Sequence, residues 1–181
     1  HYDEIIECVN AALTNTAADC CTFTIINDNN DKAVSAFIST KNQSNITSIS
    51  LNSQTAAELL NATLQSRNSD YLAIIFANAI VPPDWLPRLL TPFIDHDLTA
   101  AVSPRNNSAV QPGLQMPPGI NIFAIDRYLS GQKSNIFDTR RSNNAITVTR
   151  KSMLREIGVF NTIAINYRQC LEKAISRLES H

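Results

Sequence analysis

Hydrophobic residues recur at helical spacing in some stretches of this chain and form short extended runs in others. In residues 3–13 the apolar side chains fall on one face of a helix. Residues 21–27 are rich in apolar and β-branched residues, which is typical of a buried strand, and residues 28–31 end it with turn chemistry. The same patterns predict further strands at 46–51, 71–77 and 98–104 and further helices at 31–40, 55–67 and 85–94.

Proline and polar residues mark where several of these elements end. Pro82 and Pro83 prevent the apolar strand at 71–77 from continuing, and Asp84 is expected to cap the next helix. Residues 105–119 show little periodicity and predict a long loop. After this loop we expect a strand at 145–150, a short helix at 151–158 and an amphipathic closing helix at 167–180.

Helices and strands that alternate along a chain are typical of a layered α/β domain with mostly parallel strands. A length of 181 residues and a hydrophobic share of 44% suit a single core, so we expect one domain over residues 1–181.

The net charge of −1 gives no bulk attraction to nucleic acid or to an anionic membrane. The densest basic cluster, residues 133–151, includes Arg140 and Arg141, and we interpret it as a solvated loop. No apolar run reaches the roughly 18 residues of a spanning helix, and no signal-like segment is present. We therefore expect a soluble, cytoplasmic protein without a nucleic-acid partner or a membrane span.

The cysteines and the glycosylation-like motifs change this picture little. Cys8, Cys20, Cys21 and Cys170 form no CxxC pair and have no accompanying His cluster, so we expect reduced thiols in the core. The chain is rich in Asn, Ser and Thr, which makes chance matches to the Asn-x-Ser/Thr motif expected. Such motifs begin at Asn42, Asn45, Asn61 and Asn106.

Several short segments of the sequence occur in the same order as in a known family. These segments are "DNN" from Asp28, "NATL", "SDYLAIIFANAIVPPDWLPRLLTPF", "AITVTRKSMLREIGVF" and the "CL" of Cys170 and Leu171. Together they resemble the donor-binding half of GT-A glycosyltransferases of family 2 over nearly the whole chain. The resemblance implies a three-layer α/β/α, Rossmann-like GT-A domain. It also implies transfer of a sugar from a nucleotide-sugar donor, such as a UDP-sugar, to an acceptor hydroxyl.

The family normally opens with a strand that carries a nucleotide-binding turn, whereas this sequence begins in what matches the first helix. Parallel sheets bind ligands beyond the carboxyl ends of their strands, and Asn27 and Asp28 stand at one such end. In the enzymes that this chain resembles, the acid matching Asp28 recognises the uracil or ribose of the donor by accepting hydrogen bonds. The alternative is that Asp28 only stabilises the turn.

The resemblance places Phe76 and Asn78 where the family has the two acids of its Asp-x-Asp motif. Those acids hold Mg²⁺ or Mn²⁺ against the donor pyrophosphate, because hard cations favour charged oxygen ligands. Phe76 offers no ligand and Asn78 offers one neutral carbonyl, so no metal cofactor is expected. The alternative interpretation assigns Phe76 to the core and Asn78 to a turn.

The general base of the family is also replaced. Its usual acids fall on Ile165 and Asn166, and neither can accept a proton. Asp138 and Glu172 become candidates only if the match shifts, so no catalytic residue is assigned and enzymatic activity is left uncertain.

Two hypotheses follow from these replacements. In the first, the chain is a glycosyltransferase in which Asn27, Asp28 and Asn78 hold the donor nucleotide, while Arg140 or Arg141 supplies the positive charge of the missing metal. In the second, it is a non-catalytic GT-A-like module that serves as a scaffold or interaction domain of a larger assembly.

Overall fold

The computed structural model describes residues 2–27, 31–41, 44–50, 55–66, 68–104 and 145–156, together with positions 124, 127, 160, 173, 174, 176 and 177. The described part of the chain contains five helices with defined bounds: α1 (Tyr2–Thr14), α2 (Lys32–Thr40), α3 (Ala56–Ser66), α4 (Trp85–Asp95) and α6 (Lys151–Glu156). The strands are β1 (Phe23–Asn27), β2 (Ile46–Ser50), β3 (Tyr71–Ile75), β4 (Ala101–Val102) and β5 (Ile146–Arg150). The expected elements between residues 3 and 104 and between 145 and 156 are thereby confirmed. The expected loop at 105–119 and most of the closing helix lie outside the described residues.

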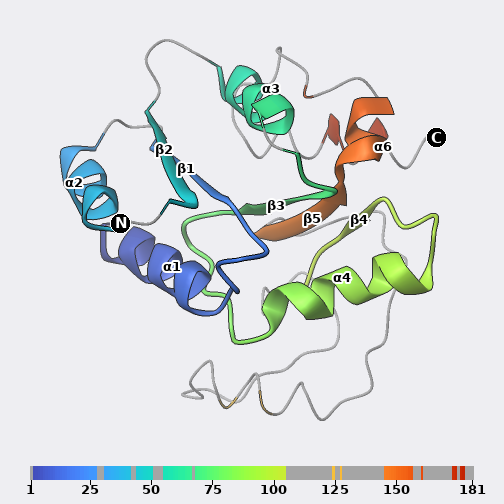
Figure 1. Cartoon of the computed structure of the whole chain (residues 1–181), viewed down its shortest axis with the longest axis horizontal. Coiled ribbons are helices and arrows are strands. Elements are labelled where there is room, and N and C mark those ends of the chain that lie inside the picture. Colours follow the sequence, from blue (N-terminus) through green and yellow to red (C-terminus); the bar gives the residue numbers. More distant parts are fainter. Residues whose placement is uncertain are drawn as a thin grey trace.

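The described strands form two separate sheets (Figure 1). In one, β1 and β2 pair in parallel, with Phe23 opposite Ile46. In the other, β5 lies between β3 and β4 and is antiparallel to both. The α/β class is confirmed, but the expectation of mostly parallel strands is not met by these pairings. An apolar pattern could not reveal this, because the period of two along a strand is the same in both pairing directions.

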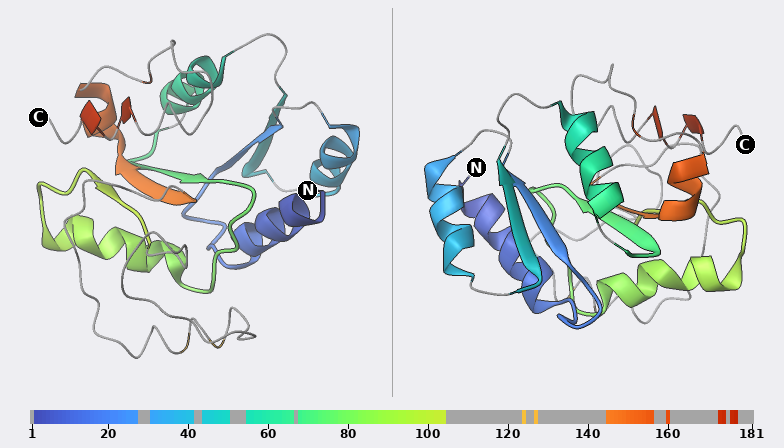
Figure 2. Two further views of the ribbon diagram at one scale, coloured as in Figure 1. Left: turned by 180° about the vertical axis from the view of Figure 1, so that it is seen from behind. Right: turned by 45° about the horizontal axis from the view of Figure 1, so that its top comes forward.

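Strand β3 has a hydrophobic core on each of its faces. Leu72, Ile74 and Phe76 pack against one core, and Tyr71 and Ile75 pack against the other, as the alternation of side chains along a strand requires. Figures 1 and 2 show α3 and α6 on one side of β3 and β5, and α1 and α4 on the other. The first core, here called the α3 core, consists of Ala57, Leu60, Leu64, Leu154, Phe160 and Ala174. The second, the α4 core, consists of Ala12, Ala79, Val81, Trp85, Phe93, Ile146 and Val148.

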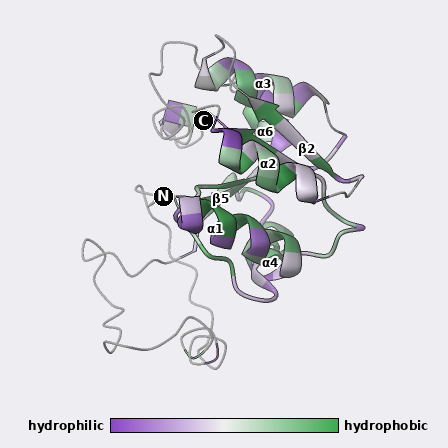
Figure 3. Cartoon of the chain, turned by 90° about the vertical axis from the view of Figure 1, so that its left-hand side faces the viewer, coloured by the Kyte–Doolittle hydropathy of each residue, from purple (hydrophilic) through white to green (hydrophobic). Residues whose placement is uncertain are grey.

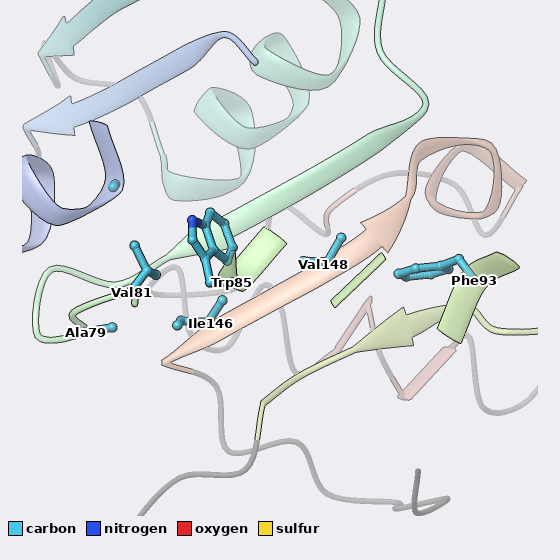
Figure 4. Packing of buried hydrophobic residues seen from close by; sticks show 7 residues of the cluster. Ala79, Val81, Trp85, Phe93, Ile146 and Val148 are labelled. Atoms are coloured by element: carbon cyan, nitrogen blue, oxygen red, sulfur yellow. The ribbon is translucent and has the colours of Figure 1, made fainter. Parts of the chain in front are cut away.

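Figure 4 shows the α4 core along β5, with Trp85, Val81 and Ile146 toward one end and Phe93 toward the other. The guanidinium of Arg150 lies 5.5 Å from the centre of the Phe93 ring and donates a hydrogen bond to the Phe93 carbonyl oxygen. This contact fixes the last residue of β5 against α4.

The start of α4 differs from the expectation. Asp84 precedes the helix, but its side chain makes no capping hydrogen bond, and its backbone is left-handed with φ of 57°. Its carbonyl oxygen instead accepts hydrogen bonds from the backbone N–H and the Nε of Arg88. Aspartate is among the non-glycine residues that tolerate this left-handed conformation best.

Helix α1 is amphipathic, with polar and apolar positions alternating along its surface in Figure 3. Cys8 and Ala12 are buried on its inner face. It lies beside α2, where Nζ of Lys41 donates a hydrogen bond to Oδ1 of Asn10 at 2.8 Å. Among the described helices, none is both long enough and apolar enough to cross a membrane.

Helix α6 begins at the residue directly after β5, with no loop between them. The backbone N–H of Lys151 donates a hydrogen bond to the carbonyl oxygen of Asp70 and so continues the ladder between β3 and β5. The Lys151 side chain is buried, and this burial lowers the pKa of its amine below the usual range. Nearby Arg155 lowers this pKa further, while Asp70 acts in the opposite direction.

Strands β1 and β3 are only half-buried, although an apolar run such as residues 21–27 is typical of a buried strand. Most residues of β1 and β3 retain partial exposure, and Ala73 in the middle of β3 is exposed. Its partner in register, Val148 of β5, is 0% exposed. Because β5 has a strand on each side and β1 and β3 have one described neighbour each, the difference follows strand pairing and not composition.

Candidate functional site

Two of the polar residues that the sequence singled out, Asn27 and Asn78, lie at the carboxyl end of β1 and just after that of β3. Asn27 is the last residue of β1 and is 5% exposed. Its Nδ2 donates hydrogen bonds to the Asp31 carbonyl oxygen at 2.8 Å and to Ser35 Oγ at 3.0 Å, and its Oδ1 accepts one from the Asp31 N–H at 3.1 Å. Asn27 therefore links β1 to α2, and both of its side-chain N–H donors are already used within the chain.

Asp31 stabilises the start of α2. Its Oδ1 accepts hydrogen bonds from the backbone N–H groups of Ala33 at 2.7 Å and Val34 at 3.3 Å. A helix N-terminus can bind a phosphate through such amides. In α2 these two donors already have a carboxylate partner within the chain, so this helix end is a weak anion site. Asp28 lies outside the described residues, and its role in donor binding stays a prediction.

Phe76 directly follows β3 and packs against the α3 core. Its backbone N–H donates to the carbonyl oxygen of Ala145, and its own carbonyl oxygen accepts a hydrogen bond from the Ala79 N–H at 3.0 Å. The interpretation that places Phe76 in the core is confirmed. An aromatic ring cannot coordinate a cation through an oxygen, so this position does not fit the divalent metal that the family resemblance implies. Within the described part of the chain, no three His, Cys, Asp or Glu side chains are grouped to hold a metal ion.

Asn78 is exposed in the turn after β3, as the same interpretation predicts. It lines a shallow hollow of about 170 Å³ together with Ala77, Ile80, Glu4 and Glu7. Pockets for drug-sized ligands typically hold about 300–1,000 Å³. This hollow is therefore too small to enclose a nucleotide, although one group of a larger ligand would fit in it.

Glu4 and Glu7 were not singled out from the sequence, yet they give this hollow its charge. They stand three residues apart on α1, so they share one helical face. Two carboxylates repel a diphosphate, so an anionic ligand beside Asn78 requires a compensating positive charge. The signal that could have revealed them is this spacing near the start of a helix, but the same spacing is common on solvent-facing helices.

The cysteines differ from one another in environment. Cys8 is buried, its thiol lies 3.6 Å from the Phe76 carbonyl oxygen, and burial raises its pKa. Cys20 is exposed and Cys21 is half-buried, so the expectation of core thiols is wrong for this pair. Their Sγ atoms are 3.5 Å apart and share a hydrogen bond, and the two thiols are not joined by a disulfide. Both follow α1 in a turn whose side chains face outward, a feature that their apolar neighbours in sequence concealed. Cys170 lies outside the described residues.

Two of the four glycosylation-like motifs can be placed. Nδ2 of Asn45 donates to the carbonyl oxygens of Ala18 and Cys21. Nδ2 of Asn61 donates to the Phe160 carbonyl oxygen at 3.1 Å, and its Oδ1 accepts from the Phe160 N–H at 2.9 Å. A sugar attached to either nitrogen would disrupt these bonds, which favours the interpretation of chance matches.

The remaining predicted residues cannot be located. Arg140 and Arg141 lie outside the described residues, and so do Asp138, Ile165, Asn166 and Glu172. The structure therefore does not relate the two arginines to Asn78, and their contact with a donor diphosphate stays a prediction.

A comparison with models of known protein families gives no match for this chain, and neither does a comparison with curated proteins.

Proposed function

We propose that the chain is a glycosyltransferase family 2-like domain of the GT-A fold that binds a nucleotide-sugar donor without the family's metal ion. The observation that carries the proposal is the position of Phe76, which directly follows β3, where the resemblance implies a metal acid, and packs against the α3 core. A family member with this residue in the core has to bind its donor by other means.

The arrangement of the described elements supports the GT-A part of the proposal. Strands β1 and β2 are parallel and are joined by α2, and β3 has a core with helices on each face. This is the layering of an α/β domain in which ligands bind beyond the carboxyl ends of the strands. Asn27, Asn78 and the hollow beside Asn78 lie at those ends.

In the proposed site, Asp28 accepts hydrogen bonds from the uracil or ribose, and Asn27 holds the turn in which that contact is made. Asn78 contacts the diphosphate side of the donor. Arg140 and Arg141 supply the charge that balances both the diphosphate and the two glutamates of the hollow.

Calorimetric titration with UDP and with a panel of UDP-sugars, with and without Mn²⁺, tests the proposal. We expect saturable binding whose Kd is the same in both conditions. Asp28→Ala and the double substitution Arg140→Ala with Arg141→Ala should each weaken it by about tenfold, which corresponds to ~1.4 kcal/mol. Binding that requires Mn²⁺ would overturn the metal-independent site, and no binding at a Kd below about 1 mM would overturn donor recognition itself.

A second function, that of a non-catalytic scaffold or interaction module, is favoured by the hollow itself. At about 170 Å³ and with two glutamates in its lining, it is a poor site for a diphosphate. This alternative predicts no donor binding and no sugar transfer or donor hydrolysis with any metal. Turnover that disappears in Asp28→Ala would refute it.

A further inference from the structure

Two adjacent thiols lie in the segment that joins α1 to β1 (Figure 1). The Sγ atoms of Cys20 and Cys21 are 3.5 Å apart and share a hydrogen bond. Cys20 is exposed and Cys21 is half-buried, while residues 17–19 before the pair and Thr22 after it are exposed as well. A reagent in solution can therefore reach the pair from the Cys20 side. Residues 17–22 are here called the dithiol turn.

The backbone of the dithiol turn is held in place by Asn45. Nδ2 of Asn45 donates hydrogen bonds to the carbonyl oxygens of Ala18 at 3.1 Å and Cys21 at 3.3 Å. The carbonyl oxygen of Asn45 accepts a hydrogen bond from the N–H of Phe23 at 2.8 Å, at the start of β1. One residue therefore connects both sides of the turn to the strand that follows it.

The thiol of Cys20 is also positioned within the turn. It donates a hydrogen bond to the carbonyl oxygen of Ala17 at 3.2 Å, and this places Sγ on the same side as the thiol of Cys21. Two ligand atoms that are already close together lose less conformational entropy when one ligand joins them. The turn thus presents the two sulfurs as a pair before any ligand is bound.

The pair is poorly suited to form a disulfide. The peptide bond between Cys20 and Cys21 is trans. Neighbouring Cα atoms are ~3.8 Å apart across a trans peptide, whereas disulfides usually join Cα atoms about 4.4–6.8 Å apart. A bridge between these neighbours would be strained, and strained disulfides are readily reduced. We therefore expect the pair to persist as a dithiol.

The pair is also poorly suited to zinc. Structural zinc sites use four protein ligands, and catalytic zinc sites use three. In the part of the chain that the structure describes, no three His, Cys, Asp or Glu side chains are grouped to hold a metal ion. The arrangement fits a centre that needs two sulfur ligands only.

We propose that Cys20 and Cys21 form a chelating site for trivalent arsenic, a soft centre that binds two sulfur atoms at once. Sulfur is a soft ligand and favours centres of this kind over hard cations. An organoarsenic(III) dihydroxide exchanges its two As–O bonds for two As–S bonds. Both S–H protons leave with the two hydroxides as two molecules of water. Arsenic stays trivalent, so the exchange needs no oxidant or reductant.

The surroundings of Cys21 are compatible with this product. Burial raises the pKa of the Cys21 thiol to about 12, and the hydrogen bond to Cys20 and the charges of Cys20 and Asp19 act in the same direction. Burial and nearby negative charge disfavour a thiolate. The arsenic–dithiol product carries no charge, so neither factor opposes it. This site is independent of the proposed donor binding, because it uses none of the residues assigned to the nucleotide.

Titration of the reduced 181-residue chain with phenylarsine oxide at neutral pH, followed by intact-protein mass spectrometry, tests the site. We expect one arsenic per chain, and after digestion it should lie on the peptide that contains Cys20 and Cys21. Cys20→Ser and Cys21→Ser should each weaken binding by about a hundredfold or more, because the second As–S bond is then lost. Cys170→Ser is the matched control and should bind like the wild type.

A comparison with the chain in urea tests the contribution of the fold. Binding in urea should be weaker by about tenfold, because the dithiol turn no longer holds the two sulfurs together. Equal affinity in urea, full affinity of either serine variant, or arsenic on another peptide would overturn the proposal. Displacement of the arsenical by an equal concentration of Zn²⁺ would overturn the two-sulfur site as well. The position of arsenic in the wild-type digest tests the site without any substitution.

Discussion

The indole Nε1 of Trp85 donates a hydrogen bond to Oγ1 of Thr16 at 2.9 Å, and the two side chains are only 5% and 9% exposed. This bond joins the first residue of α4 to the turn after α1, across 69 positions of sequence. It ties the α1 side of the α4 core to the segment that follows β3. Asn15 strengthens the same junction, because its Nδ2 donates to the Val81 carbonyl oxygen at 2.8 Å.

Thr16→Val should destabilise the fold, because it keeps the shape of the side chain but leaves the buried indole N–H without an acceptor. We expect a loss of ~1–3 kcal/mol in the free energy of unfolding. Urea unfolding followed by the fluorescence of the chain's single tryptophan measures it. Thr16→Ser retains the hydroxyl and should lose clearly less. Equal stability of the valine variant and the wild type would show that the bond contributes nothing.

Asn61 holds the chain at Phe160 through two hydrogen bonds, so Asn61→Ala should also destabilise the fold. Both backbone groups of Phe160 lose their partner while the ring remains in the α3 core. The expected loss is ~1–3 kcal/mol by denaturant unfolding. Asn68→Ala, at an exposed position, is the matched control and should change stability by less than about 0.5 kcal/mol.

Cys21 should react slowly with iodoacetamide. The pKa of its thiol is raised to about 12, mainly by burial and also by the hydrogen bond to Cys20 and the charges of Cys20 and Asp19. The thiolate is the reactive form, so alkylation of Cys21 at pH 8 should be much slower than that of a thiol in a denatured peptide of the chain. Mass spectrometry of digested protein gives the rate at each cysteine.

The same shift has a consequence for stability against pH. The pKa of Cys21 in the folded state is above its value in the unfolded chain, so the folded state holds this proton more tightly. The free energy of unfolding therefore keeps its full contribution from Cys21 below about pH 9 and loses it as the pH rises toward 12. Cys20→Ser removes one ionisable neighbour and should bring the onset of Cys21 alkylation to lower pH. An unchanged pH profile in that variant would show that Cys20 does not influence Cys21.

Glu7→Gln should strengthen the binding of UDP if the diphosphate lies beside Asn78. Removal of one negative charge a few ångströms away is worth ~1 kcal/mol in water, or about fivefold in Kd. Calorimetric titration measures the change, and Glu156→Gln on α6, an exposed position, is the control. Equal affinities of the Glu7→Gln variant and the wild type would place the nucleotide away from the hollow.

The sequence located elements well because their signals are local. The helical spacing of residues 3–13 and the apolar run at 71–77 depend only on neighbours along the chain, and both elements are present. The direction of β5 and the partial exposure of Ala73 were not predictable in this way, because both depend on which strands lie alongside.

The roles of side chains at the candidate site were also only partly predictable from the local sequence. The placement of Phe76 in the core agreed with one of two interpretations, since an aromatic residue after an apolar strand has a strong local preference for burial. Asn27 was expected to contact a ligand, but its amide is engaged with Asp31 and Ser35, four and eight residues further along. The residue types fit either role, and only the hydrogen-bond geometry distinguishes them.

The direct passage from β5 into α6 removes a hinge from this part of the molecule. Lys151 belongs at once to the ladder with Asp70 and to the first turn of the helix, and Leu154, one turn later, is fixed in the α3 core. With no loop residue available to absorb a change in backbone angles, a displacement of α6 has to carry β5 and β3 with it. A displacement of the helix and a displacement of the strand are therefore one and the same motion.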